Sequence, residues 1–104
     1  MVKFVGLIRL KPGYDPDETW KMWREKHSVW GKSLLHPELK EYHINRVIST
    51  IGESTIYGFS EMLFDDVESC KRAFDRVLKA PPDDVLPRFQ IERLILEYEQ
   101  VPLD

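Results

Sequence analysis

A long amphipathic segment between two prolines most constrains what this chain can fold into. Residues 16 to 35, PDETWKMWREKHSVWGKSLL, begin with Pro16 directly after Asp15 and end shortly before Pro37. Asp at the N-cap, proline at the first helical position and Glu18 in the first turn favour a helix start, and Pro37 prevents its continuation. Residues spaced by three or four share one face of such a helix. The predicted buried stripe is Trp20, Trp23, His27, Trp30 and Leu34.

Four other segments have the β-branched composition and alternation typical of strands, at residues 3 to 10, 39 to 50, 55 to 64 and 93 to 101. The short turn IGES between the second and third predicts an antiparallel hairpin. A second helix is expected from a cap at Asp65 to about Ala80. The order β-α-β-β-α-β predicts an α+β, ferredoxin-like fold, in which two helices cover one face of a four-stranded antiparallel sheet.

The size and charge of the chain narrow the classes of partner. A length of 104 residues predicts a single domain over residues 1–104. The net charge of −3 gives no basic footprint for nucleic acid, and we expect no membrane segment. One cysteine, Cys70, allows no internal disulfide and favours a cytoplasmic location. The first and fourth strands are apolar on both faces, so we expect a second copy of the chain to cover the face without helices, giving a homodimer.

The tryptophan-rich helix has two interpretations. An aromatic stripe at helical spacing is often core, and a histidine within it is often a satisfied core group. Three indoles are nevertheless a large volume for one helical layer, and the sheet offers small residues opposite them: Gly6, Gly58 and Ser60, all on the side predicted to face the helices. Large residues against small ones can leave an aromatic pocket with one imidazole pointing inward, which is typical of a small-molecule site.

A second group of polar residues lies on the predicted second and third strands. His43, Asn45 and Glu61 would cluster if the two strands align them, although an exposed edge-strand histidine is an equally good interpretation of His43. The histidines lack metal-site spacing, so we expect no metal. Phosphate-binding loops and a serine nucleophile elbow are also absent from the sequence, and Cys70 is expected to be core filler.

Three sequence segments, RLKPGYDPDETWKMWREKHSVW, LKEYHINRV and YGFSEMLFDD, resemble the EthD-type branch of the dimeric α+β barrel proteins in order and spacing. The matching positions are Lys11, Pro12, Gly13, Trp20, Trp23, His27, Tyr42, Asn45, Val47, Gly58, Glu61 and Phe64. Two positions depart from the family pattern: Val29 replaces a frequent proline, and Arg46 replaces a frequent histidine. The resemblance implies a homodimer with a ligand cavity between helices and sheet in each subunit, and relatives include isomerases, cyclases, decarboxylases, dehydratases and oxygenases.

The favoured hypothesis is a cofactor-independent enzyme, of isomerase, cyclase, decarboxylase or dehydratase type, that acts on a hydrophobic, carbonyl-containing or aromatic small molecule in catabolism or biosynthesis. We expect His27 to transfer a proton and Trp20, Trp23 and Trp30 to shape the pocket. The expected substrate-binding residues, including those for a developing oxyanion, are Tyr42, His43, Asn45, Arg9 and Glu61. Two alternatives remain: a non-catalytic ligand-binding or structural dimer, and a haem-degrading or cofactor-free monooxygenase.

Overall fold

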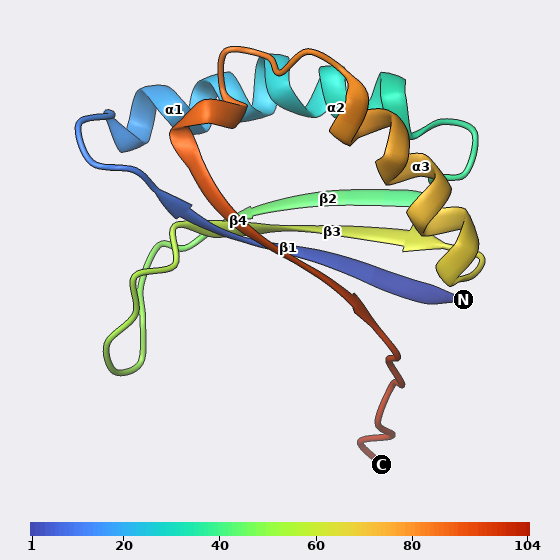
Figure 1. The fold of residues 1–104 in the computed structure, drawn as a ribbon. Helices are drawn as coiled ribbons and strands as arrows, with labels where there is room; N and C mark the ends of the chain where they lie inside the picture. The colour runs from blue at the N-terminus through green and yellow to red at the C-terminus, as the bar shows by residue number, and fades with distance from the viewer.

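In the computed structural model, which describes residues 1–104, the helices cover one face of a four-stranded sheet (Figure 1). The strands are β1 (Val2–Leu10), β2 (Glu41–Arg46), β3 (Gly58–Phe64) and β4 (Phe89–Leu96). Their order is β2-β3-β1-β4, and each neighbouring pair is antiparallel. This is the predicted ferredoxin-like arrangement, so the fold class is confirmed.

The predicted first helix forms as three consecutive segments. These are α1 (Pro16–Met22), a π-helical turn η1 (Trp23–His27) and α2 (Ser28–Leu35). Asp15 is its N-cap, accepting hydrogen bonds from the backbone N–H groups of Asp17 and Glu18 at 2.8 and 3.0 Å. The second long helix, α3 (Val67–Lys79), is capped by Asp66 through the backbone N–H of Ser69, one residue later than predicted.

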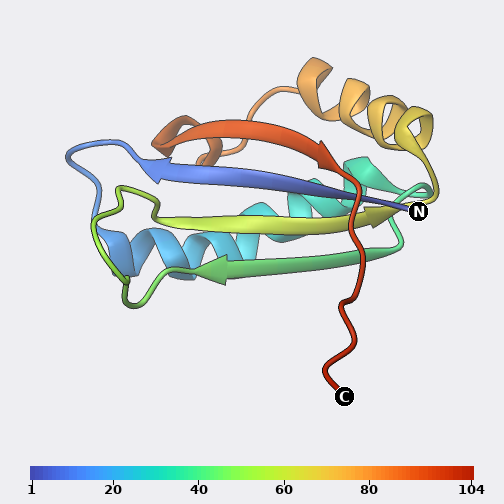
Figure 2. The ribbon, with the colours of Figure 1, turned by 90° about the horizontal axis from the view of Figure 1, so that it is seen from below.

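Strand boundaries depart from prediction most at the hairpin and at the C-terminus. β2 and β3 are shorter than expected, and the chain between Arg46 and Gly58 forms a long loop in place of a four-residue turn. β4 begins at Phe89, four residues earlier than predicted, directly after a one-turn helix η2 (Leu86–Arg88). Residues 97 to 104, part of which was assigned to this strand, extend away from the sheet (Figures 1 and 2).

The core lies between the sheet and the helices in two clusters. In each cluster the sheet contributes alternate residues, because successive strand side chains point to opposite faces. The cluster beneath α2 and α3 contains Phe4, Leu35, Met62, Phe64, Cys70, Ala73 and Val77. The cluster beneath α1 and η2 contains Ile8, Trp23, Val85 and Phe89.

The opposite face of the sheet carries no helix, as Figure 2 shows. The strand register places Val5, Leu7 and Leu94 there. Leu94 is 41% exposed, and Leu96 on the same face is 37% exposed. An apolar sheet face therefore lies open in the single chain. No helix is both long enough and apolar enough to cross a membrane.

Candidate functional site

The π turn decides which face of the first helix is buried. The most buried positions are Thr19, Trp23, His27, Gly31 and Leu35, spaced by four throughout. Steps of four overshoot a full turn of an α-helix by about 40°. A π turn contains more residues than an α turn and offsets this drift. The predicted stripe is therefore wrong in detail: Trp23 and His27 are central, whereas Trp20, Trp30 and Leu34 lie at its half-buried edges.

His27 is held in an aromatic setting by one strong polar contact. Its Nδ1 lies 2.8 Å from a carboxylate oxygen of Asp83, and the two side chains are only 11% and 14% exposed. Trp30 stacks on the imidazole with ring centroids 5.3 Å apart, and Phe89 meets it edge-on at 5.9 Å. A carboxylate only accepts hydrogen bonds, so Nδ1 is the donor, and in the neutral imidazole Nε2 carries the free lone pair. Nε2 has no hydrogen-bond partner in the protein.

Asp83 was not predicted as a site residue, although the two prolines before it in the sequence indicate that it lies in a turn. Pro81 and Pro82 follow the end of α3, and Asp83 lies in the turn that leads into η2, where its side chain accepts backbone hydrogen bonds. Its Oδ1 accepts from the backbone N–H groups of Leu86 at 2.9 Å and Val85 at 3.3 Å, while Oδ2 contacts His27. Backbone hydrogen bonds thus hold one oxygen of the carboxylate in place, and the other oxygen is left to contact the imidazole.

His27 faces a small, partly open cavity between the helices and the sheet. Its volume of about 50 Å³ is comparable with the space of one or two water molecules. Trp23, Trp30 and Tyr42 line it together with the small residues Gly6 and Ser60. The small residues predicted to face the helices do so, and a Cβ at Gly58 would overlap the backbone carbonyl oxygen of Asn45 and lie 2.9 Å from the Trp23 ring.

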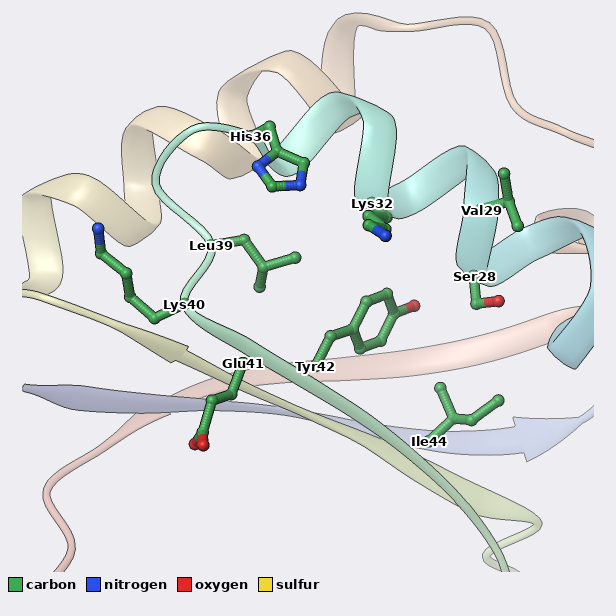
Figure 3. A pocket seen from close by; sticks show the side chains of 9 residues that line it. All are labelled: Ser28, Val29, Lys32, His36, Leu39, Lys40, Glu41, Tyr42 and Ile44. Atoms are coloured by element: carbon green, nitrogen blue, oxygen red, sulfur yellow. The ribbon is translucent and has the colours of Figure 1, made fainter.

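Tyr42 separates this cavity from an open groove of about 520 Å³ between α2 and β2 (Figure 3). The Tyr42 ring lines both spaces, and its hydroxyl lies close to Gly31, where an added Cβ would be 3.6 Å away. The hydroxyl has no hydrogen-bond partner in the protein. Burial, and secondarily the negative charge of Asp83, raises the pKa of Tyr42 to about 12. Tyr42 is therefore a neutral donor at any physiological pH.

Arg93 is the only permanently charged side chain that lines this small cavity. It lies on β4 directly opposite Gly6 of β1, on the sheet face that the helices cover. Arg93 is exposed to solvent in the single chain, but partial burial still lowers the pKa of its guanidinium, and no carboxylate is bonded to it. Arg93 was predicted to lie in a strand, but not on the side that faces the helices. An unpaired guanidinium that lines the same cavity as an imidazole is able to stabilise a negatively charged oxygen there.

The remaining predicted polar residues lie on the other face of the sheet. His43 pairs with Glu61 in the β2–β3 register, and Asn45 donates to the Glu61 carboxylate at 3.0 Å, so the predicted alignment of these three residues is confirmed. Arg9, on the same face, bonds Glu92 at 2.9 Å and Thr55 at 3.0 Å. Strand alternation directs all four away from His27. Their expected place in one site with His27 is therefore wrong.

Other predicted residues have simpler surroundings. Trp20 packs edge-on against Trp23 at 5.3 Å and does not line the cavity, whereas Trp30 does. Cys70 is 1% exposed within the core, and burial raises its pKa to about 11, so its thiol is protonated. No three His, Cys, Asp or Glu side chains lie close enough together to hold a metal ion.

Comparison with known proteins identifies the fold. No protein-family model and no curated protein matches the sequence. Among solved structures, an EthD family protein from Bacillus halodurans is similar at a TM-score of 0.64 and 22% identity, covering 95% of this chain and 99% of that one. The Arabidopsis thaliana protein At3g17210 gives a TM-score of 0.70 at 15% identity, covering 99% and 100%.

A third similar structure is that of SnoaB from Streptomyces nogalater, described as a cofactor-independent oxygenase. It gives a TM-score of 0.59 at 15% identity, covering 96% of this chain and 94% of that one. The predicted resemblance to EthD-type proteins is thus confirmed at the level of the fold. The similarity extends over nearly the whole chain, including the C-terminal third that the sequence motifs did not cover.

Proposed function

We propose that this protein is a cofactor-independent enzyme that transfers a proton at a carbon next to a carbonyl group of a hydrophobic small molecule. The observation that carries the proposal is the His27–Asp83 pair at the wall of the cavity, with Nε2 of His27 unpartnered. An imidazole can act as base and acid near neutral pH. A carboxylate on Nδ1 keeps the proton there, orients the ring and stabilises the imidazolium that forms when Nε2 accepts a proton.

The same site contains candidates to stabilise the enolate oxygen. Removal of a proton next to a carbonyl moves negative charge onto the oxygen, and hydrogen-bond donors aimed at that oxygen lower the barrier. The Tyr42 hydroxyl keeps the oxyanion-binding role predicted for it, and Arg93 takes the role predicted for Arg9 and Asn45. Tyr42 and Arg93 both line the cavity that His27 faces, and neither donates to another side chain.

Substrate access requires a rearrangement at Tyr42. A cavity of about 50 Å³ cannot accommodate an organic substrate, whereas the neighbouring groove measures about 520 Å³. Tyr42 is the residue common to both, and no hydrogen bond fixes its hydroxyl. A rotation of this side chain would join the groove to the space in front of His27. We propose this movement as the step that admits the substrate.

Proton transfer next to a carbonyl group is a step shared by several types of reaction. Deprotonation beside a carbonyl can begin an isomerisation or cyclisation, and return of the proton can complete a decarboxylation or dehydration. The fold is one in which SnoaB is described as a cofactor-independent oxygenase, which supports the use of such a cavity without a cofactor. The aromatic wall formed by Trp23, Trp30 and Tyr42 favours an apolar, planar substrate.

We also propose that the protein functions as a homodimer, with the apolar sheet faces packed together. Leu94→Glu, on the open face, should then give a monomer in size-exclusion chromatography with light scattering. Leu78→Glu is the control, because Leu78 is 66% exposed on α3, away from that sheet face. A monomeric wild type, or equal behaviour of the two variants, would contradict the dimer.

The enzymatic proposal is tested by binding and turnover together. Tryptophan fluorescence would be titrated with aromatic ketones, lactones and polyketide-like ketones, and every compound that binds would be incubated and analysed by mass spectrometry. His27→Gln should lower turnover by about 100-fold or more. His43→Gln, the same substitution on the other sheet face, should leave it unchanged. A His27→Gln protein as active as the wild type would remove His27 from the mechanism.

A further inference from the structure

The groove between α2 and β2 combines an apolar floor with cationic and hydrogen-bonding groups at its edge (Figure 3). Leu39, Ile44 and Val29 supply the apolar surface. Lys32 extends from α2 on the side of the groove above the Tyr42 ring. The Tyr42 hydroxyl is directed along the groove toward the side where Ser28 lies. A molecule with an apolar body and one anionic end matches this distribution of groups.

The charges around the groove favour an anion. Lys32 is exposed and has no ion pair or hydrogen bond with any residue of the chain. Lys40, at the same rim, lies 3.8 Å from Asp65, a loose and solvent-exposed contact. Glu41 is the one carboxylate among the lining residues, and Figure 3 shows its side chain pointing away from α2. The α2 side of the groove therefore has positive charge without a counter-ion.

We propose that this groove binds the carboxylate of a small amphipathic organic acid, with Lys32 as the charged anchor and the Tyr42 hydroxyl as a second donor. The apolar part of the acid lies along Leu39 and Ile44. Recognition of a carboxylate by an ammonium group and a neutral hydroxyl needs no change in protonation of either group. The further identification of this acid as the substrate rests on the proposed function, because it places the acid at the residue that separates the groove from His27.

Binding can be measured without any turnover. We would titrate ¹⁵N-labelled protein with 4-phenylbutanoate and with its neutral isostere 4-phenylbutanamide, following backbone amide signals. The acid should bind about five-fold more tightly than the amide and shift signals of residues 28 to 32 and 39 to 44. Lys32→Gln should weaken binding of the acid about five-fold and leave that of the amide unchanged. Added salt should weaken binding of the acid and leave binding of the amide unchanged.

Lys21→Gln is the matched control, because Lys21 is an exposed lysine of α1 that does not line the groove and its loss changes the net charge equally. Equal affinity for acid and amide, equal effects of the two lysine substitutions, or the absence of shifts in the groove would each overturn the proposal. His27→Gln separates it from the proposed function. If His27→Gln binds the acid as tightly as the wild type does and also turns over substrate at the wild-type rate, the catalytic proposal fails and the groove proposal stands.

Discussion

Replacing Asp83 by Asn tests how the site sets the proton position on His27. In the wild type the carboxylate accepts from Nδ1 at 2.8 Å, so the neutral imidazole carries its proton on Nδ1. In Asp83→Asn the new amide would keep its oxygen on the backbone N–H of Leu86, which lies 2.9 Å from the Asp83 oxygen, because the reverse orientation places two donors against each other. The NH₂ group of the amide would then face Nδ1. The imidazole should respond by moving its proton to Nε2.

The expected energetic cost is modest, which makes the experiment decisive. Asp83→Asn exchanges a charge-assisted hydrogen bond for a neutral one, a loss of about 1 kcal/mol in the free energy of unfolding. For a domain of this size the melting temperature should fall by about 4–8 °C. Asp83→Ala removes the acceptor from both His27 and the η2 turn, and should cost about 3 kcal/mol. The Asn variant therefore remains folded while its tautomer changes.

The assay is a long-range ¹H–¹⁵N correlation spectrum of the histidine rings at a pH where His27 is neutral. The wild type should show a protonated Nδ1 and an unprotonated Nε2, and Asp83→Asn should exchange the two patterns. Turnover of any substrate found should fall together with this change, because Nε2 is no longer a base. Identical ring signals in the two proteins, or a protonated Nε2 in the wild type, would refute the assigned role of Asp83.

Two further predictions concern packing and charge. Gly58→Ala should destabilise the protein by about 3 kcal/mol or more, because its Cβ would overlap the backbone carbonyl oxygen of Asn45 and also lie 2.9 Å from the Trp23 ring. Gly31→Ala, whose Cβ meets nothing closer than 3.6 Å, should be neutral or stabilising, and chemical denaturation measures both. Glu38, bonded chiefly by Arg76, has its pKa lowered from 4.5 to about 2. Because its pKa is lowered in the folded protein, ionised Glu38 stabilises the fold above about pH 4.5. This contribution is lost as the pH falls toward 2 and the carboxylate becomes protonated. Glu38→Gln should flatten the dependence of stability on pH in that interval, and an unchanged slope would contradict the role given to this ion pair.

The fold was predictable because its signals are local. The cap at Asp15 and the breaker at Pro37 define the first helix, and strand composition supplied the element order. Strand ends were predicted poorly, since β4 begins at Phe89 only because η2 turns the chain back toward Leu10 of β1. Apolar residues continue past Leu96, and composition alone cannot tell a paired strand from an extended tail.

The candidate site was only half predictable. The burial of Trp23 and His27 was predictable from helical periodicity, because both residues remain on the buried face of the helix through the π turn. Asp83 is 56 residues away from His27 in the sequence, and its approach depends on how the segment after α3 returns across the helix. The same limit applies to Arg93, which faces the cavity only because of the β1–β4 register. Arg9 and Asn45 were assigned to the site by residue type, whereas strand parity sends them to the other face.

The most direct test of the central claim is hydrogen exchange at carbon. Aromatic ketones and lactones that bind the protein would be incubated with it in D₂O, and ¹H NMR would follow loss of the signal from the proton next to the carbonyl. Proton transfer by His27 predicts protein-dependent exchange that His27→Gln reduces by about 100-fold and His43→Gln does not alter. Binding of these compounds without exchange, or exchange that is equal in the wild type and His27→Gln, would contradict proton transfer by His27.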